Sequence, residues 1–124
     1  MTVTIRSATP TDASHVLALW REAEAHPSHT DDIESIKSLV AHDPDALLVA
    51  EDGGRIVGSV IAAWDGWRGS IYRLTVAPDH RRAGLGRHLL AAAEHRLGDA
   101  GAARLQAIVV ETDVRATNFW RATT

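Results

Sequence analysis

A strand, a turn, a basic loop and a helix follow one another without interruption between Ile71 and Leu97. Apolar and polar residues alternate over 71–76, which is the two-residue period of a strand. Pro78 favours a turn directly afterwards, because proline cannot donate a hydrogen bond to a strand ladder. The apolar residues of 85–97 then recur at helical spacing, so they share one face. These residues are Leu85, Leu89, Leu90, Ala93 and Leu97.

The loop between this strand and this helix has the composition of an anion-binding site. Gly84 and Gly86 remove side chains where backbone must approach a ligand closely. The first N–H groups of a helix have no internal partner and point outward, toward any anion placed there. Arg81, Arg82 and Arg87 lie at the positive end of the helix dipole, which is unfavourable unless an anion binds. The pattern indicates a phosphate ligand, and an ordinary solvated basic loop is the alternative.

The loop pattern Arg81-x-x-Gly84-x-Gly86 follows the strand pattern Leu74-x-Val76-x-Pro78. Together they resemble motif A of the GNAT superfamily of acyl-CoA-dependent N-acyltransferases. In that family the amides of the loop bind the coenzyme A pyrophosphate, and the strand hydrogen-bonds the pantetheine arm. The resemblance implies acetyl-CoA as cosubstrate, without a metal. The coenzyme A-binding residues would be Leu74, Thr75, Val76, Arg81, Arg82, Ala83, Gly84, Leu85, Gly86, Arg87, Asp113 and Phe119.

The remaining chain predicts an α/β fold with a mixed sheet. The order is strand, helix, helix, three strands, helix, strand, helix, which is similar to the front of the GNAT fold. We expect one domain over residues 1–124. Thr11 or Asp12 is the expected cap of the first helix, and Asp31 or Asp32 that of the second. The expected strands cover 3–7, 46–50, 55–63, 71–76 and 104–111, and the expected helices 12–24, 33–40, 85–97 and 114–121.

Composition excludes several classes of protein. The chain has no cysteine, so disulfides, thiolate zinc sites and a cysteine nucleophile are excluded. Its apolar runs are too short to cross a bilayer, and its start lacks a signal-peptide layout, so we expect a cytoplasmic protein without a membrane partner. The formal net charge of −3 fits a small anionic ligand better than a nucleic acid. A nucleic-acid module using the arginine cluster is therefore a distant alternative.

The connection around His26 and His29 has two interpretations. Together with Asp31 and Asp32 these histidines could suggest a metal site, but the spacing is loose and a polar loop explains it better. In the resembled family this connection borders the acceptor pocket, which would turn both histidines toward substrate.

The chain departs from the family pattern near its C-terminus. Asp113 stands where an asparagine often contacts coenzyme A, and Trp120 where a tyrosine often acts as general acid. Two further strands common in the family are absent, so we expect the sequence to be truncated after the fourth helix. The strand over 104–111 would then be a bare edge that recruits a partner, giving a possible homodimer.

The resemblance implies direct attack of an amine on the acetyl-CoA thioester in a ternary complex. The backbone N–H of Val76 would stabilise the oxyanion. Glu111 is the first candidate for the base and Asp65 the second, with a water chain equally open. Tyr72 is the only tyrosine, and packing explains it better than acid catalysis. A truncated acyl-CoA-binding protein with little or no turnover is the main alternative to an N-acetyltransferase of a small-molecule, peptide or protein amine.

Overall fold

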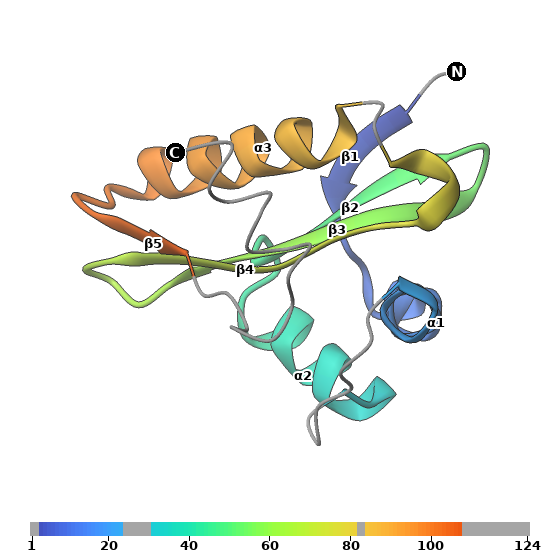
Figure 1. Ribbon diagram of the computed structural model, residues 1–124. Helices are drawn as coiled ribbons and strands as arrows, with labels where there is room; N and C mark the ends of the chain where they lie inside the picture. The colour runs from blue at the N-terminus through green and yellow to red at the C-terminus, as the bar shows by residue number, and fades with distance from the viewer. Residues whose placement is uncertain (1–2, 24–30, 82–83, 108–124) are drawn as a thin grey trace.

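The computed structural model describes residues 3–23, 31–81 and 84–107 (Figure 1). The first half of these residues forms a strand, two helices and a hairpin. The second half forms a strand, a helix and a further strand. In chain order the elements are β1 (Val3–Ser7), η1 (Pro10–Asp12), α1 (Ala13–Ala23), α2 (Ile33–His42), β2 (Leu47–Asp52), β3 (Arg55–Trp64), β4 (Gly69–Val76), η2 (Pro78–His80), α3 (Leu85–Ala100) and β5 (Leu105–Ala107).

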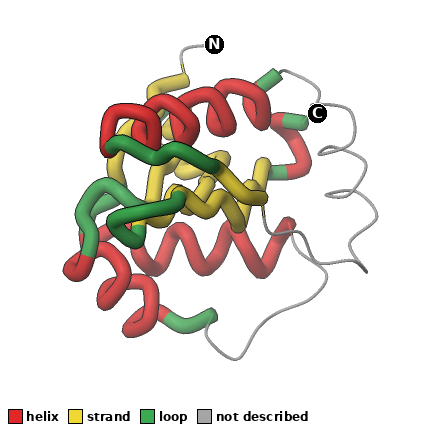
Figure 2. The backbone as a smooth tube through the Cα atoms, turned by 90° about the vertical axis from the view of Figure 1, so that its left-hand side faces the viewer, coloured by secondary structure: helices red, strands yellow, loops and turns green. Residues whose placement is uncertain are grey.

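The strands form one mixed sheet in the order β1-β2-β3-β4-β5. The first four strands pair antiparallel, and β5 pairs parallel to β4 through Gly69–Leu105 and Ile71–Ala107. The helix α3 makes the crossover that a parallel pair requires. It covers one face of the sheet, while α1 and α2 cover the other (Figure 1). The tube in Figure 2 shows the same layers from the side, with strands between helices. The mixed α/β fold expected from the sequence is confirmed.

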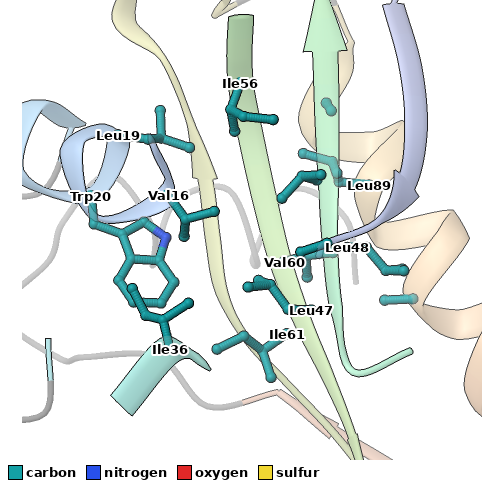
Figure 3. Close-up of a cluster of buried hydrophobic side chains, with 14 of the residues drawn as sticks. Val16, Leu19, Trp20, Ile36, Leu47, Leu48, Ile56, Val60, Ile61 and Leu89 are labelled. Carbon is teal, nitrogen blue, oxygen red and sulfur yellow. The ribbon is translucent and has the colours of Figure 1, made fainter. Parts of the chain in front are cut away.

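The core lies on both faces of β3, the middle strand. Figure 3 shows Trp20 and Ile36 on the side that α1 and α2 cover, and Leu89 on the opposite side. Because β3 is covered on both faces, its residues from 56 to 62 are all buried instead of alternating. Of the stripe expected from its spacing, α3 buries Leu85, Leu89, Ala93 and Leu97, while Leu90 is partly buried against the core.

The absence of a side chain at Gly58 lets α3 approach β3 closely. A Cβ built there would lie 2.8 Å from Cδ1 of Leu89. Real carbon atoms do not come so close, so a larger residue at this position would force the side chain of Leu89 to move. This packing fixes where the start of α3 lies relative to the end of β4.

The helix starts differ in part from the sequence expectation. The first helical turn begins earlier than expected, with Thr9 at the cap of η1, and the N–H of Thr9 donates to Oδ2 of Asp12 over 2.7 Å. The carboxylate of Asp12 also accepts from Arg6, at 2.8 and 3.0 Å. Asp32 caps α2 as expected, accepting from the N–H of Ser35 at 2.7 Å. None of the helices in the described part of the chain is long and apolar enough to cross a bilayer.

Candidate functional site

The helix α3 begins at a glycine in the left-handed region. Gly84 has φ +80° and caps the helix. Its carbonyl accepts the N–H of His88 at 3.2 Å, and, apart from Gly84 itself and its chain neighbours, no described residue has an atom within 4 Å of a Cβ placed there. Residues other than glycine adopt this conformation at a cost. The unpaired N–H groups of the first turn of α3 therefore follow a residue that has no side chain to obstruct them. This is the geometry of an anion site at a helix N-terminus.

The backbone of Val76 points away from β3. The N–H of Ala77 donates to the carbonyl of Val57 at 2.8 Å, so these two residues form a hydrogen-bonded antiparallel pair. Antiparallel ladders alternate, so the neighbouring pair Gly58–Val76 is not hydrogen-bonded. The N–H and C=O of Val76 therefore face the side of β4 on which β5 pairs. This orientation agrees with the expected role of the Val76 N–H as oxyanion donor, which remains a prediction.

Arg81 lies at the junction of strand, loop and first helix. Its Nε donates to the carbonyl of Val76 and its Nη2 to the carbonyl of Ala23, both at 3.3 Å. The guanidinium thus joins the end of β4 to the end of α1. The expected contact of Arg81 with coenzyme A stays a prediction. Because Arg81 also joins β4 to α1, an effect of its mutation on folding must be separated from an effect on binding. Sequence spacing could not show this contribution, because it depends on the position of α1.

A bulge interrupts β4 three residues before Val76. The register changes between the pairs Ser59–Thr75 and Ile61–Tyr72, which leaves two residues of β4 opposite one of β3. Arg73 occupies the bulge with φ +54°, the one positive φ of a non-glycine residue among those described. The alternating pattern of 71–76 gave no signal for this bulge.

Both the side chain and the backbone carbonyl of Arg73 make contacts with other elements of the fold. Its guanidinium lies 4.5 Å from the ring centre of Trp20 and forms an ion pair with Asp31. Its carbonyl accepts from the hydroxyls of Ser59 and Thr75, each at 3.4 Å. A strained backbone conformation persists only where several contacts impose it. Sequence analysis missed Arg73, since its partners are far away in the chain.

The other expected residues of β4 lie in or against the core. Tyr72 and Leu74 are half-buried and pack on the core, and Thr75 is buried. In the first turn of α3, Leu85 is buried, whereas the side chain of Arg87 is exposed. The side chains of Tyr72 and Leu74 thus have a packing role, and the expected contact of β4 with coenzyme A stays a prediction.

Asp65 is engaged in the turn between β3 and β4. Its Oδ1 accepts the N–H groups of Arg68 and Trp67, at 2.7 and 2.8 Å. These bonds, with that from Arg68 foremost, lower the pKa of the Asp65 carboxyl below its ordinary value. A carboxylate stabilised in this way is a weaker base, which disfavours Asp65 as the general base.

Several expected residues lie outside the described part of the chain. They are His26, His29, Arg82, Ala83, Glu111, Asp113, Phe119 and Trp120. Gly86 lies in the first turn of α3. Across the described residues, no three His, Cys, Asp or Glu side chains gather in a way that could hold a metal ion.

A surface cleft of about 660 Å³ lies at the other end of α3, away from Gly84. Arg96, which borders it, donates to Asp43 at 2.5 Å and to the carbonyl of Asp45 at 2.8 Å. His95, also on its wall, pairs with Asp99 at 3.2 Å. The guanidinium of Arg96 is thus engaged with Asp43 and Asp45 on the wall of this cleft.

The comparisons with known proteins identify the family. A family model described as the acetyltransferase (GNAT) family matches residues 13–123, so the chain belongs to the GNAT acetyltransferase family. An acetyltransferase of Pectobacterium atrosepticum is 38% identical over 100 residues, which cover 81% of this chain and 71% of the relative. The resemblance inferred from Arg81, Gly84 and Gly86 is thereby confirmed at the level of the family.

Two solved structures show the same fold. Ard1 from Thermoplasma volcanium has a TM-score of 0.86 and 19% identity, with 99% of this chain and 82% of the other covered. The PaiA N-acetyltransferase from Thermoplasma acidophilum, solved in complex with coenzyme A, has a TM-score of 0.83 and 15% identity, with 99% and 89% covered. At these identities the likeness supports the arrangement of the elements alone.

Proposed function

We propose that the protein is an acetyl-CoA-dependent N-acetyltransferase that acts on a primary amine by direct attack in a ternary complex. The observation that carries the proposal is Gly84, which has a φ of +80° and caps the 16-residue helix α3, the helix that follows β4 and η2 in the chain. Family membership supports acetyl transfer, and the coenzyme A complex of the PaiA neighbour supports this cosubstrate.

The residues at the start of α3 fit the pyrophosphate of coenzyme A. The backbone N–H groups from Arg82 to Arg87 would bind it, because a helix N-terminus carries unpaired donors and partial positive charge. Gly84 is left-handed, and, apart from its chain neighbours, no described residue would lie within 4 Å of a Cβ there. Asp113 and Phe119 complete the expected set on the strength of the family resemblance.

The backbone of β4 fits the pantetheine arm and the acyl group. Leu74 belongs to the bulge and Val76 lies after it, and the polar groups of Val76 face the β5 side. The cosubstrate supplies a thioester carbonyl that an amine can attack. The N–H of Val76 would stabilise the negative charge that develops on its oxygen. Glu111 remains the first candidate for the group that accepts the amine proton, and mutation of Glu111 tests this role.

The acceptor is proposed as a small-molecule, peptide or protein amine. The experiment is a measurement of free thiol release from acetyl-CoA with a panel of amines and peptides, together with calorimetry of coenzyme A binding. Amine-dependent thiol release supports the proposal. Tight coenzyme A binding without release from any amine favours the alternative, an acyl-CoA-binding protein with little turnover. The homodimer expected from the sequence also stays a prediction, which light scattering tests.

A further inference from the structure

His80 lies between two carboxylates just before the candidate loop. Its side chain is 9% exposed, its Nε2 lies 2.9 Å from Oδ2 of Asp52, and its Nδ1 lies 2.9 Å from Oδ1 of Asp79. An ionised carboxylate only accepts hydrogen bonds, and a neutral imidazole carries one N–H. Both contacts are therefore satisfied together only by the imidazolium form. In the neutral form, one ring nitrogen would present a lone pair to a carboxylate.

The charges around this cluster also favour the imidazolium. Oδ2 of Asp79 accepts from Nη1 of Arg55 at 2.7 Å, and Nη2 of Arg55 lies 3.8 Å from Oε1 of Glu22. Arg81 follows His80 in the chain but is hydrogen-bonded to two backbone carbonyls. Three carboxylates thus face one guanidinium when His80 is neutral. Hydrogen bonding to Asp52, and then to Asp79, raises the pKa of His80 above its ordinary value. The pKa of Asp79 is lowered to about 2, chiefly by Arg55 and next by His80.

The cluster connects the entrance of the loop to the sheet. Asp52 is the last residue of β2, Asp79 and His80 belong to η2, and Gly84 follows four residues after His80. The backbone N–H of His80 also donates to the carbonyl of Ala77 at 2.9 Å, which closes the turn of η2 after β4. Releasing His80 from Asp52 would remove a side-chain anchor of η2 to the β2–β3 hairpin.

We propose that His80 is a positioning residue for coenzyme A binding: its imidazolium, held between Asp52 and Asp79, fixes η2, the turn between β4 and the helix start at Gly84. This inference rests on the proposed function. Coenzyme A affinity then falls as pH rises and His80 loses its proton. The fall is about tenfold, the size expected when a charge-assisted hydrogen bond is lost.

The test is calorimetry of coenzyme A binding from pH 6.5 to 9, with NMR titration of the His80 ring in the same samples. Wild type should lose affinity at the pH where the ring titrates. His80→Gln should bind coenzyme A weakly at every pH in this range. The difference in affinity between wild type and this variant should therefore shrink as pH rises. Asp52→Asn, which keeps the histidine, should move the titration and the loss of affinity together to lower pH. His95→Gln is the matched control, because His95 is 80% exposed at the far end of α3.

The outcomes separate this inference from the proposed function. A pH profile in His80→Gln that equals the wild-type profile overturns the positioning role of His80. The same conclusion follows if Asp52→Asn moves the ring titration but leaves the affinity profile in place. Absence of coenzyme A binding at every pH would refute the proposed function and the inference with it, while the NMR titration would still report the charge of His80.

Discussion

The indole Nε1 of Trp20 donates a 2.8 Å hydrogen bond to Oγ of Ser59, joining α1 to the middle strand of the sheet. Ser59 is fully buried and Trp20 is 5% exposed. The hydroxyl of Ser59 in turn donates to the carbonyl of Arg73, whose guanidinium lies over the same indole ring. The bulge in β4 is therefore held by a buried polar cluster whose members come from three elements.

Ser59→Ala should destabilise the protein by about 1–3 kcal/mol, because it leaves a buried indole N–H without its acceptor. Urea unfolding followed by circular dichroism measures the change. Ser7→Ala is the matched control, since the hydroxyl of Ser7 makes an exposed hydrogen bond to Asp45 at 3.0 Å. That variant should stay within about 0.5 kcal/mol of wild type. Equal losses of stability in the two variants would show that the Trp20–Ser59 hydrogen bond does not stabilise the protein more than an exposed one does.

Arg73→Gly should be more stable than Arg73→Ala by about 1 kcal/mol, because the backbone at this residue has a positive φ. Both variants remove the ion pair with Asp31, so their difference reports the backbone alone. In an ordinary strand the order is reversed, since glycine is less stable there than alanine. Thr4, an exposed residue of β1, provides that comparison: Thr4→Gly should be less stable than Thr4→Ala. An Ala variant at residue 73 as stable as the Gly variant would argue against the left-handed conformation.

The pairing of Asp12 with Arg6 predicts a loss of stability in acid. The Arg6 guanidinium, more than the hydrogen bonds from Thr9, lowers the pKa of the Asp12 carboxyl to about 2, although burial opposes this. A lowered pKa means that the folded state binds the proton more weakly than the unfolded state. The stabilisation is thus fully present above about pH 4 and disappears as pH falls toward 2.

Asp12→Asn tests this pH dependence. Its destabilisation relative to wild type should be on the order of 1 kcal/mol near pH 6 and should shrink steadily toward pH 2. Urea unfolding at a series of pH values measures both proteins. Asp99→Asn, at a side chain 72% exposed, should show little effect at any pH. A difference for Asp12→Asn that stays constant or grows in acid would contradict the assignment.

The sequence was sufficient to predict the central strand, loop and helix, because local patterns determine them. The buried stripe of α3 agrees with the helical spacing, and Gly84 lies at the helix start as its position suggested. The bulge at Arg73 was not predictable in this way. It depends on Trp20 and Asp31, which reach it only once α1 and the start of α2 pack on the sheet.

Side-chain partners were the least predictable part of the candidate site. Arg81 was expected to act through its charge, yet its guanidinium donates to the carbonyls of Val76 and Ala23. Asp31 was considered for a helix cap or a metal site, and it pairs with Arg73 instead. The contacts of Arg81 with Ala23 and of Arg73 with Asp31 join residues far apart in sequence, so spacing along the chain carries no signal for them.

The most direct test of the account is coenzyme A binding to Gly84→Val and Gly101→Val, measured by calorimetry at one salt concentration. The two glycines cap the opposite ends of α3 and have positive φ, +80° and +100°. Apart from adjacent chain residues, no described residue would lie within 4 Å of a Cβ added at either one. The two substitutions therefore impose a similar backbone cost on the same helix. Circular dichroism establishes that each variant is folded. The account predicts that Gly84→Val abolishes binding while Gly101→Val keeps the wild-type affinity. Wild-type affinity in a folded Gly84→Val variant would contradict it.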